Sequence, residues 1–142
     1  MKSEKLKPQA EYLLSLGYGS DIISEVLDFS STKNISAGFF EAIGAVQGVV
    51  LAYYDQQAKE YLQLSQDERM EIASCMGNIC EKEGERFAHA HITCARGDGS
   101  TLAGHLVSCK VFACELRLKA YENRILRQPD EKTGLWLMDL EE

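Results

Sequence analysis

The chain has 142 residues, of which 45% are hydrophobic and 26% are charged, and its formal net charge is −7. This composition predicts one globular domain with an apolar core, and the acidic balance disfavours non-specific binding to phosphate backbones. No apolar run reaches the about 20 residues of a membrane span, and residues 1–9 lack the apolar segment of a signal peptide. The sequence therefore predicts no membrane partner.

The five cysteines are odd in number and include no Cys-x-x-Cys pair. In a chain without an export signal, this usage predicts a cytoplasmic location and reduced thiols. We expect most of them to be small buried hydrophobic residues.

In chain order, residues 1–9 form a polar lead that we expect to be flexible, and residues 10–142 form a single domain. Residues 11–16 predict a short strand, and the apolar spacing after them predicts a helix over 21–30. Ser20 and Asp21 are the alternative N-caps of this helix.

The run 36–44 is small, apolar and rich in glycine, which predicts a strand with a bulge or a close backbone approach. Glu41 is its single charge. A carboxylate among apolar neighbours is either a site residue or a solvent-facing strand position, and both alternatives stay open. Residues 46–55 and 60–64 follow as a predicted hairpin.

The second half of the chain predicts further strands. Residues 70–80 form one, with Gly77-Asn78 at its middle, and two more cover 101–110 and 111–121. The tail 122–142 predicts irregular structure whose apolar residues pack on the body. The predicted fold class is α+β, a mostly antiparallel sheet with one main helix.

All three histidines, His89, His91 and His105, lie in two apolar runs that flank the turn Gly97-Asp98-Gly99. This pattern predicts a β-hairpin. Alternation places His89 and His91 on one face. If the turn is centred on Asp98, with an odd loop, His91 lies opposite His105 at about 4.5–5.5 Å between Cβ atoms, and the three rings converge.

Three histidines around an open position are typical of catalytic zinc sites, although imidazole also suits iron, copper and nickel. The alternative is three polar strand residues that face solvent, because a two-residue turn or a bulge would turn His105 away. In the odd-loop register Cys94 faces away from the histidines. Cys109 shares their face and is an alternative soft ligand.

At these residues the chain resembles the plants-and-prokaryotes conserved domain, PPC, in its single-domain bacterial or archaeal form. The family pattern is a Gly-x-His-x-His strand followed by a Gly-Gly-His-Leu strand. They correspond here to Phe87-Ala88-His89-Ala90-His91 and Ala103-Gly104-His105-Leu106. The first glycine of each motif is replaced, by Phe87 and Ala103, and the histidines are kept. Other matching pieces, within a resemblance that spans about residues 11–140, are Ala37-Gly38-Phe39-Phe40, Ile43-Gly44-Ala45, Tyr53-Tyr54-Asp55, Gly77-Asn78-Ile79 and Thr133-Gly134-Leu135.

The resemblance implies an antiparallel sheet with one main helix, a homotrimer, and a divalent metal, often zinc, on His89, His91 and His105. Plant members join the domain to a DNA-binding AT-hook, an Arg-Gly-Arg-Pro segment that this chain lacks. Alpha-acetolactate decarboxylase has a similar sheet and a three-histidine zinc, an analogy at the level of fold alone.

Three functions follow as hypotheses. The first is a metal-binding domain of unknown cellular role. The second is a zinc-dependent lyase or hydrolase acting on a small molecule, with Glu41 as acid–base group and Asn78 as a polar contact. The third is a DNA-binding or regulatory protein, which needs a shared basic face. The residues that could form this face are Lys110, Arg117, Lys119, Arg124 and Arg127.

Overall fold

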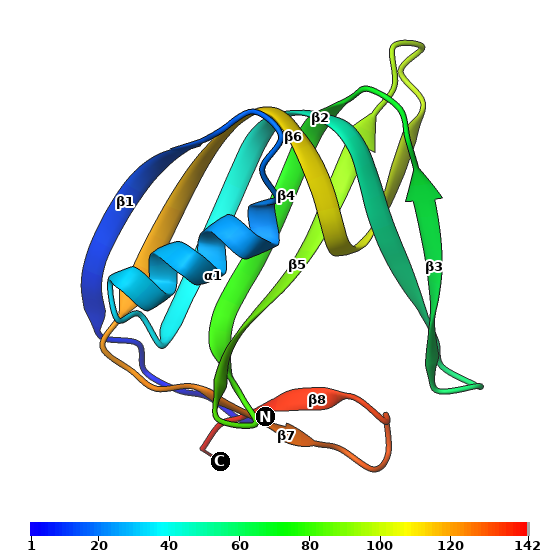
Figure 1. Cartoon of the computed structure of the whole chain (residues 1–142). Coiled ribbons are helices and arrows are strands. Elements are labelled where there is room, and N and C mark those ends of the chain that lie inside the picture. The colour runs from blue at the N-terminus through cyan, green and yellow to red at the C-terminus, as the bar shows by residue number, and fades with distance from the viewer. Residues whose placement is uncertain (142) are drawn as a thin grey trace.

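A strongly curved sheet wraps around one helix in the computed structural model, which describes residues 1–141 (Figure 1). In chain order the elements are β1 (Pro8–Leu16), α1 (Ile22–Thr32), β2 (Ala37–Asp55), β3 (Glu60–Gln66), β4 (Met70–Lys82), β5 (Glu85–Ala95), β6 (Thr101–Tyr121), β7 (Leu126–Pro129) and β8 (Trp136–Asp139). The predicted fold class, a mostly antiparallel sheet with one main helix, is confirmed.

Four strands close on themselves. The sheet runs in the order β3-β2-β6-β5-β4-β7-β8, and β2 also pairs with β4. The antiparallel pairs β2–β6, β6–β5, β5–β4 and β4–β2 therefore form a barrel, with β1 added along β6. Helix α1 packs on β5 and β6, and buries Ile22 and Val26 in the main core. Side chains on the other face of these strands point outward.

Helix α1 begins and ends within two residues of its predicted bounds. Asp21 is the N-cap, as one of the two alternatives predicted, and its side chain accepts a hydrogen bond from the Ser24 amide. This is the only α-helix among residues 1–141, and it is too short and too polar to cross a bilayer.

Strands β2 and β6 are each continuous where the sequence predicted two strands. The interruptions are bulges, since the pairing of β2 with β6 leaves Gln47 as an extra residue in β2 and Phe112 and Val107 as extra residues in β6. The register shift beside Gly44 comes from an extra residue in β4, because two steps from Ala42 to Gly44 oppose three from Cys75 to Ile72. Gly44, at φ +143°, instead shows the predicted close backbone approach, which it makes to β6. A bulge changes the side-chain alternation without ending the strand, and the sequence pattern alone does not distinguish the two.

The tail was predicted to be irregular, and this was wrong. Residues 126–139 contain the hairpin β7–β8, and β7 pairs in parallel with β4. The predicted apolar packing is present, because Ile125 is buried with Ala37 and Cys80 in a second small cluster. Leu6 of the N-terminal lead packs on the same cluster. Strands of four residues carry too few side chains for a clear periodicity.

All five cysteines are free and buried. Burial raises the pKa of the Cys75 and Cys109 thiols to about 12, and that of Cys114 to about 11. These thiols are inert core side chains, as predicted for most of them.

Candidate metal centre

The β5–β6 hairpin has the predicted register. His91 lies directly opposite His105, and a five-residue loop, 96–100, joins the two strands around Asp98. His89, two residues before His91, points to the same face. Because β5 and β6 lie side by side in the barrel wall, this register gathers all three imidazoles outside the barrel, opposite the core.

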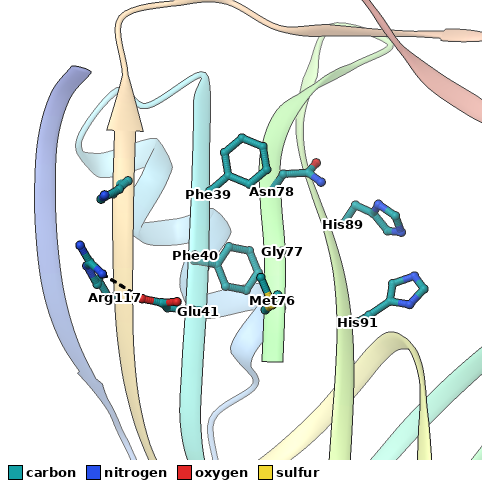
Figure 2. A pocket seen from close by; sticks show the side chains of 10 residues that line it. Phe39, Phe40, Glu41, Met76, Gly77, Asn78, His89, His91 and Arg117 are labelled. Carbon is teal, nitrogen blue, oxygen red and sulfur yellow. Dashed lines mark hydrogen bonds and ion pairs between the residues drawn. The ribbon is translucent and has the colours of Figure 1, made fainter. Parts of the chain in front are cut away.

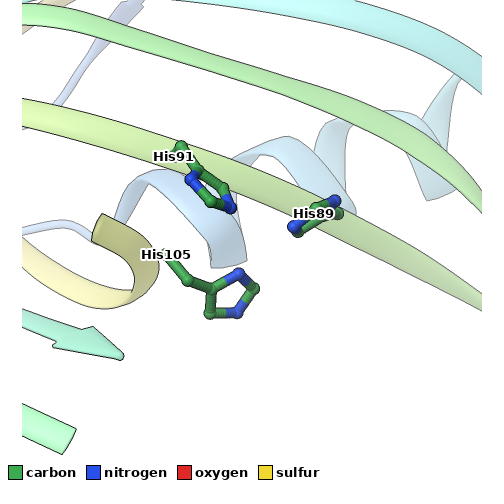
Figure 3. Close-up of side chains that lie close together, drawn as sticks. All are labelled: His89, His91 and His105. Carbon is green, nitrogen blue, oxygen red and sulfur yellow. The ribbon is translucent and has the colours of Figure 1, made fainter. Parts of the chain in front are cut away.

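The three rings face one another (Figure 3). Their centroids are 5.1 Å apart for His89–His91 and His89–His105, and 5.7 Å for His91–His105. One ring nitrogen from each residue lies within 4.8 Å of the others. His91 is exposed and the other two are half-buried, so the cluster opens to solvent on one side.

The electrostatic environment keeps the buried imidazoles neutral. Burial first, then the charge of Arg127 and the neighbouring histidines, lowers the pKa of His89 to about 4. Burial, with His91 and Arg127, also lowers the pKa of His105. The Nδ1 atom of His105 is buried and has no hydrogen-bond partner within residues 1–141. Neutral imidazoles, one with an unsatisfied buried nitrogen, fit a divalent transition metal.

Two residues beside the cluster were not predicted as site residues. Tyr61 of β3 has its ring centroid 5.3 Å from that of His105. Arg127 of β7 places Nη2 at 3.4 Å from Nδ1 of His89. Both come from elements distant in sequence from the hairpin, and no motif around either of them indicates a site.

Asn78 is brought to the site, as the sequence suggested. It lies opposite His89 in the β4–β5 pair. Its Oδ1 accepts a hydrogen bond from Nη2 of Arg127 at 3.1 Å. Asn78 therefore connects Arg127 to the strand beside the histidines.

Glu41 is not brought next to the histidines. It lies opposite Met76 of β4, which in turn lies opposite His91, so two strand spacings, roughly 10 Å, separate Glu41 from His91. Its carboxylate pairs with Arg117 Nη1 at 3.1 Å. Figure 2 shows this ion pair on one side of a pocket of about 370 Å³ and His89 and His91 on the other. The exposed Glu41 thus occupies a solvent-facing strand position, the second of the two alternatives.

Cys109 does not share the histidine face, so that prediction was wrong. Ser108 pairs with Val50 and Leu106 pairs with Leu51, which leaves Val107 as an extra residue in β6. This bulge reverses the alternation and turns Cys109 into the main core. Cys94 faces away from the histidines into the same core, as predicted.

The comparison with protein families shows to which family the chain belongs. The model of the Plants and Prokaryotes Conserved (PCC) domain, the family introduced above as PPC, matches residues 3–121. The chain belongs to this family. The hairpin β7–β8, which carries Arg127, lies beyond the matched range.

Solved structures agree with the PCC assignment. A metal-containing protein from Archaeoglobus fulgidus is 38% identical, with TM-score 0.93, over 97% of this chain and 99% of that one. A candidate DNA-binding protein from Bacteroides thetaiotaomicron is 33% identical, with TM-score 0.88, over 99% and 98% of the two chains. Acetolactate decarboxylase from Bacillus subtilis, at 15% identity and TM-score 0.52 over 86% and 56%, shares the fold alone. No curated protein matches.

Two of the five basic residues considered for a nucleic-acid surface are paired with acidic ones in this PCC domain. Arg117 pairs with Glu11 and Glu41, and Arg124 pairs with Glu81. Arg127 is half-buried between β7 and the histidine cluster. Only Lys110 and Lys119 of the five residues considered for a nucleic-acid surface are exposed and outside these contacts.

Proposed function

We propose that this PCC domain binds one divalent transition metal ion, zinc before others, through His89, His91 and His105. The observation that carries the proposal is the set of three converging imidazole nitrogens within 4.8 Å of one another. The similar protein from Archaeoglobus fulgidus is called metal-containing, which supports the same reading. When bound, zinc supplies Lewis-acid chemistry.

A zinc-dependent lyase or hydrolase acting on a small molecule is the second candidate. The half-buried Arg127 and Asn78 beside His89 favour it, because polar groups that converge on a metal site are typical of substrate positioning. The side of the cluster at His91 is open to solvent and gives a small molecule access. Glu41 is unsupported as the acid–base group for the metal site of its own chain, because two strand spacings separate it from His91.

DNA binding has less support, although a similar protein carries that description. The chain has a net charge of −7, and Arg117 and Arg124 are neutralised by carboxylates. A protein that binds phosphate backbones needs several uncompensated cations on one surface.

We further propose a homotrimer in the cytoplasm. Large apolar side chains are exposed on the outer face of the barrel, which favours self-association. The free thiols suit a reducing compartment.

The test of the metal is elemental analysis of untagged protein purified without added metal. We expect about one metal ion per chain, and its loss in each of His89→Ala, His91→Ala and His105→Ala. The fold should survive in all three, since a core of this size forms without a metal, and circular dichroism checks this.

The matched control is Thr93→Ala, which removes a polar side chain from β5 two residues after His91 and leaves the imidazoles in place. It should keep its metal. Wild-type protein without metal after incubation with zinc or iron would contradict the proposal, as would histidine variants that retain it.

A further inference from the structure

Arg127 is held rigidly beside the histidine cluster. Its Nη1 donates to the Trp136 carbonyl oxygen at 2.6 Å, and its Nε donates to Sγ of Cys80 at 3.0 Å. Its guanidinium carbon lies 5.5 Å from the ring centre of Phe87, the residue that stands where the family motif has glycine. These contacts fix the guanidinium in place before any ligand arrives.

The charge of Arg127 has no negative partner. Arg127 takes part in none of the ion pairs, with N···O distances up to 4.0 Å, that residues 1–141 form. Its hydrogen-bond partners are a thiol, a carbonyl, an amide and an imidazole, all neutral. A half-buried cation without a counter-charge is costly, and such a group is typical of a site that receives an anion.

Metal binding and the Arg127–His89 contact exclude each other. A guanidinium only donates hydrogen bonds, so Nδ1 of His89 must accept the contact at 3.4 Å. A neutral imidazole has one nitrogen with a free lone pair. When His89 gives this lone pair to a metal, one N–H of Arg127 loses its acceptor at the edge of the site.

The same change brings two positive charges close together. A divalent ion on the histidines and the guanidinium of Arg127 repel each other, and a negative ligand between them relieves the repulsion. The released N–H is then positioned to donate to an oxygen of that ligand. Carboxylates fit both partners, since they ligate zinc and accept from arginine.

We propose that the centre takes a small carboxylate, bound between the metal and Arg127. This rests on the proposed metal site and names the class of its ligand. Arg127 is the residue that selects for negative charge. A neutral ligand of the metal gains nothing from it.

The test uses full-length protein loaded with cobalt(II), whose visible absorption reports ligand binding. Sodium acetate is the carboxylate probe and imidazole is the neutral probe. For Arg127→Gln we expect acetate affinity to fall at least about tenfold, the usual effect of losing one charge-assisted hydrogen bond. Imidazole affinity should stay within about twofold.

Zinc affinity in acetate-free buffer gives a second readout of opposite sign. The Arg127→Gln variant lacks the positive charge beside the metal site, so we expect it to bind zinc several-fold more tightly than wild-type protein does. A purely structural role would weaken zinc and both probes together. Arg124→Gln, the matched control, removes the same charge from an exposed residue paired with Glu81 and should change none of these values.

The outcomes separate the two proposals. Wild-type protein that binds no metal overturns both the metal site and the carboxylate site. Wild-type protein that binds metal, and whose acetate affinity is unchanged by Arg127→Gln, overturns the carboxylate site alone. Equal losses for acetate and imidazole in Arg127→Gln also overturn it, because Arg127 then only supports the fold.

Discussion

Gly44 of β2 lies directly against the backbone of β6. A Cβ atom at this position would be 2.1 Å from the Ala113 carbonyl oxygen and 2.8 Å from Cα of Cys114. Its φ of +143° is strained for any other residue. We expect Gly44→Ala to lower the free energy of unfolding by at least about 2 kcal/mol, because neither backbone atom can move without shifting β6. Urea denaturation measures this.

Gly97→Ala is the control for that substitution. Gly97 lies in the β5–β6 loop, and no heavy atom is near enough to touch an added Cβ. Its change should stay within about 0.5 kcal/mol. If both variants are equally stable, the close approach of β2 and β6 at Gly44 does not constrain the fold.

At the scale of residues, the sequence predicts features that depend only on residues close together in the chain. The histidine register follows from two-residue alternation and one odd loop, and both are local. Cys109 was misplaced because the extra residue Val107 in β6 has no sequence signal. Arg127 was missed as a site residue because only the pairing of β7 with β4 brings it to His89.

At the scale of elements, Asp21 joins α1 to the sheet. Its Oδ2 accepts from the Ser24 amide at 2.9 Å, which caps the helix, and its Oδ1 accepts from the Cys109 amide at 2.6 Å. Asp21→Ala removes the cap and leaves a partly buried N–H of β6 unpaired. We expect a loss of about 2–4 kcal/mol in the free energy of unfolding, again from urea denaturation.

Asp21→Asn keeps an amide oxygen that can accept one of these bonds, so it should lose roughly half as much. The comparison tests whether both acceptor oxygens of Asp21 contribute to stability. Equal stability of Asp21→Ala and wild-type protein would show that the bridge between α1 and β6 contributes nothing.

The long elements were predictable, and the short ones were not. Helix α1 has eleven residues and a clear apolar face with a capping residue before it. The four-residue strands β7 and β8 have neither, and their structure depends on pairing with distant residues of β4. The tail therefore reads as irregular in sequence although it forms one wall of the candidate site.

At the scale of the whole molecule, closure of the barrel depends on contacts far apart in the chain. The pairing of β2 with both β4 and β6 joins residues that are 24 to 84 positions apart in the sequence. Apolar patterns identify strands but leave the order of pairing open. The resemblance to the PPC family supplied the overall fold, which the structure confirms. Its trimer remains a prediction.

The outer face of the barrel is the candidate surface for that trimer. Leu13, Ile43 and Met76 are 83%, 58% and 64% exposed, and they line one pocket together on β1, β2 and β4. Apolar side chains gathered in this way favour burial against another copy. We expect wild-type protein to have the mass of three chains in light scattering. Ile43→Glu should give a smaller assembly, because a carboxylate in an apolar interface is costly.

Leu137→Glu provides the control for this prediction. Leu137 is also exposed, at 42%, but it lies on β8, away from the pocket between β1, β2 and β4. The trimer should persist in this variant at the concentration where Ile43→Glu dissociates. If wild-type protein has the mass of one chain, these apolar side chains serve a different partner. If it has the mass of three chains and Ile43→Glu does too, the copies associate through another face.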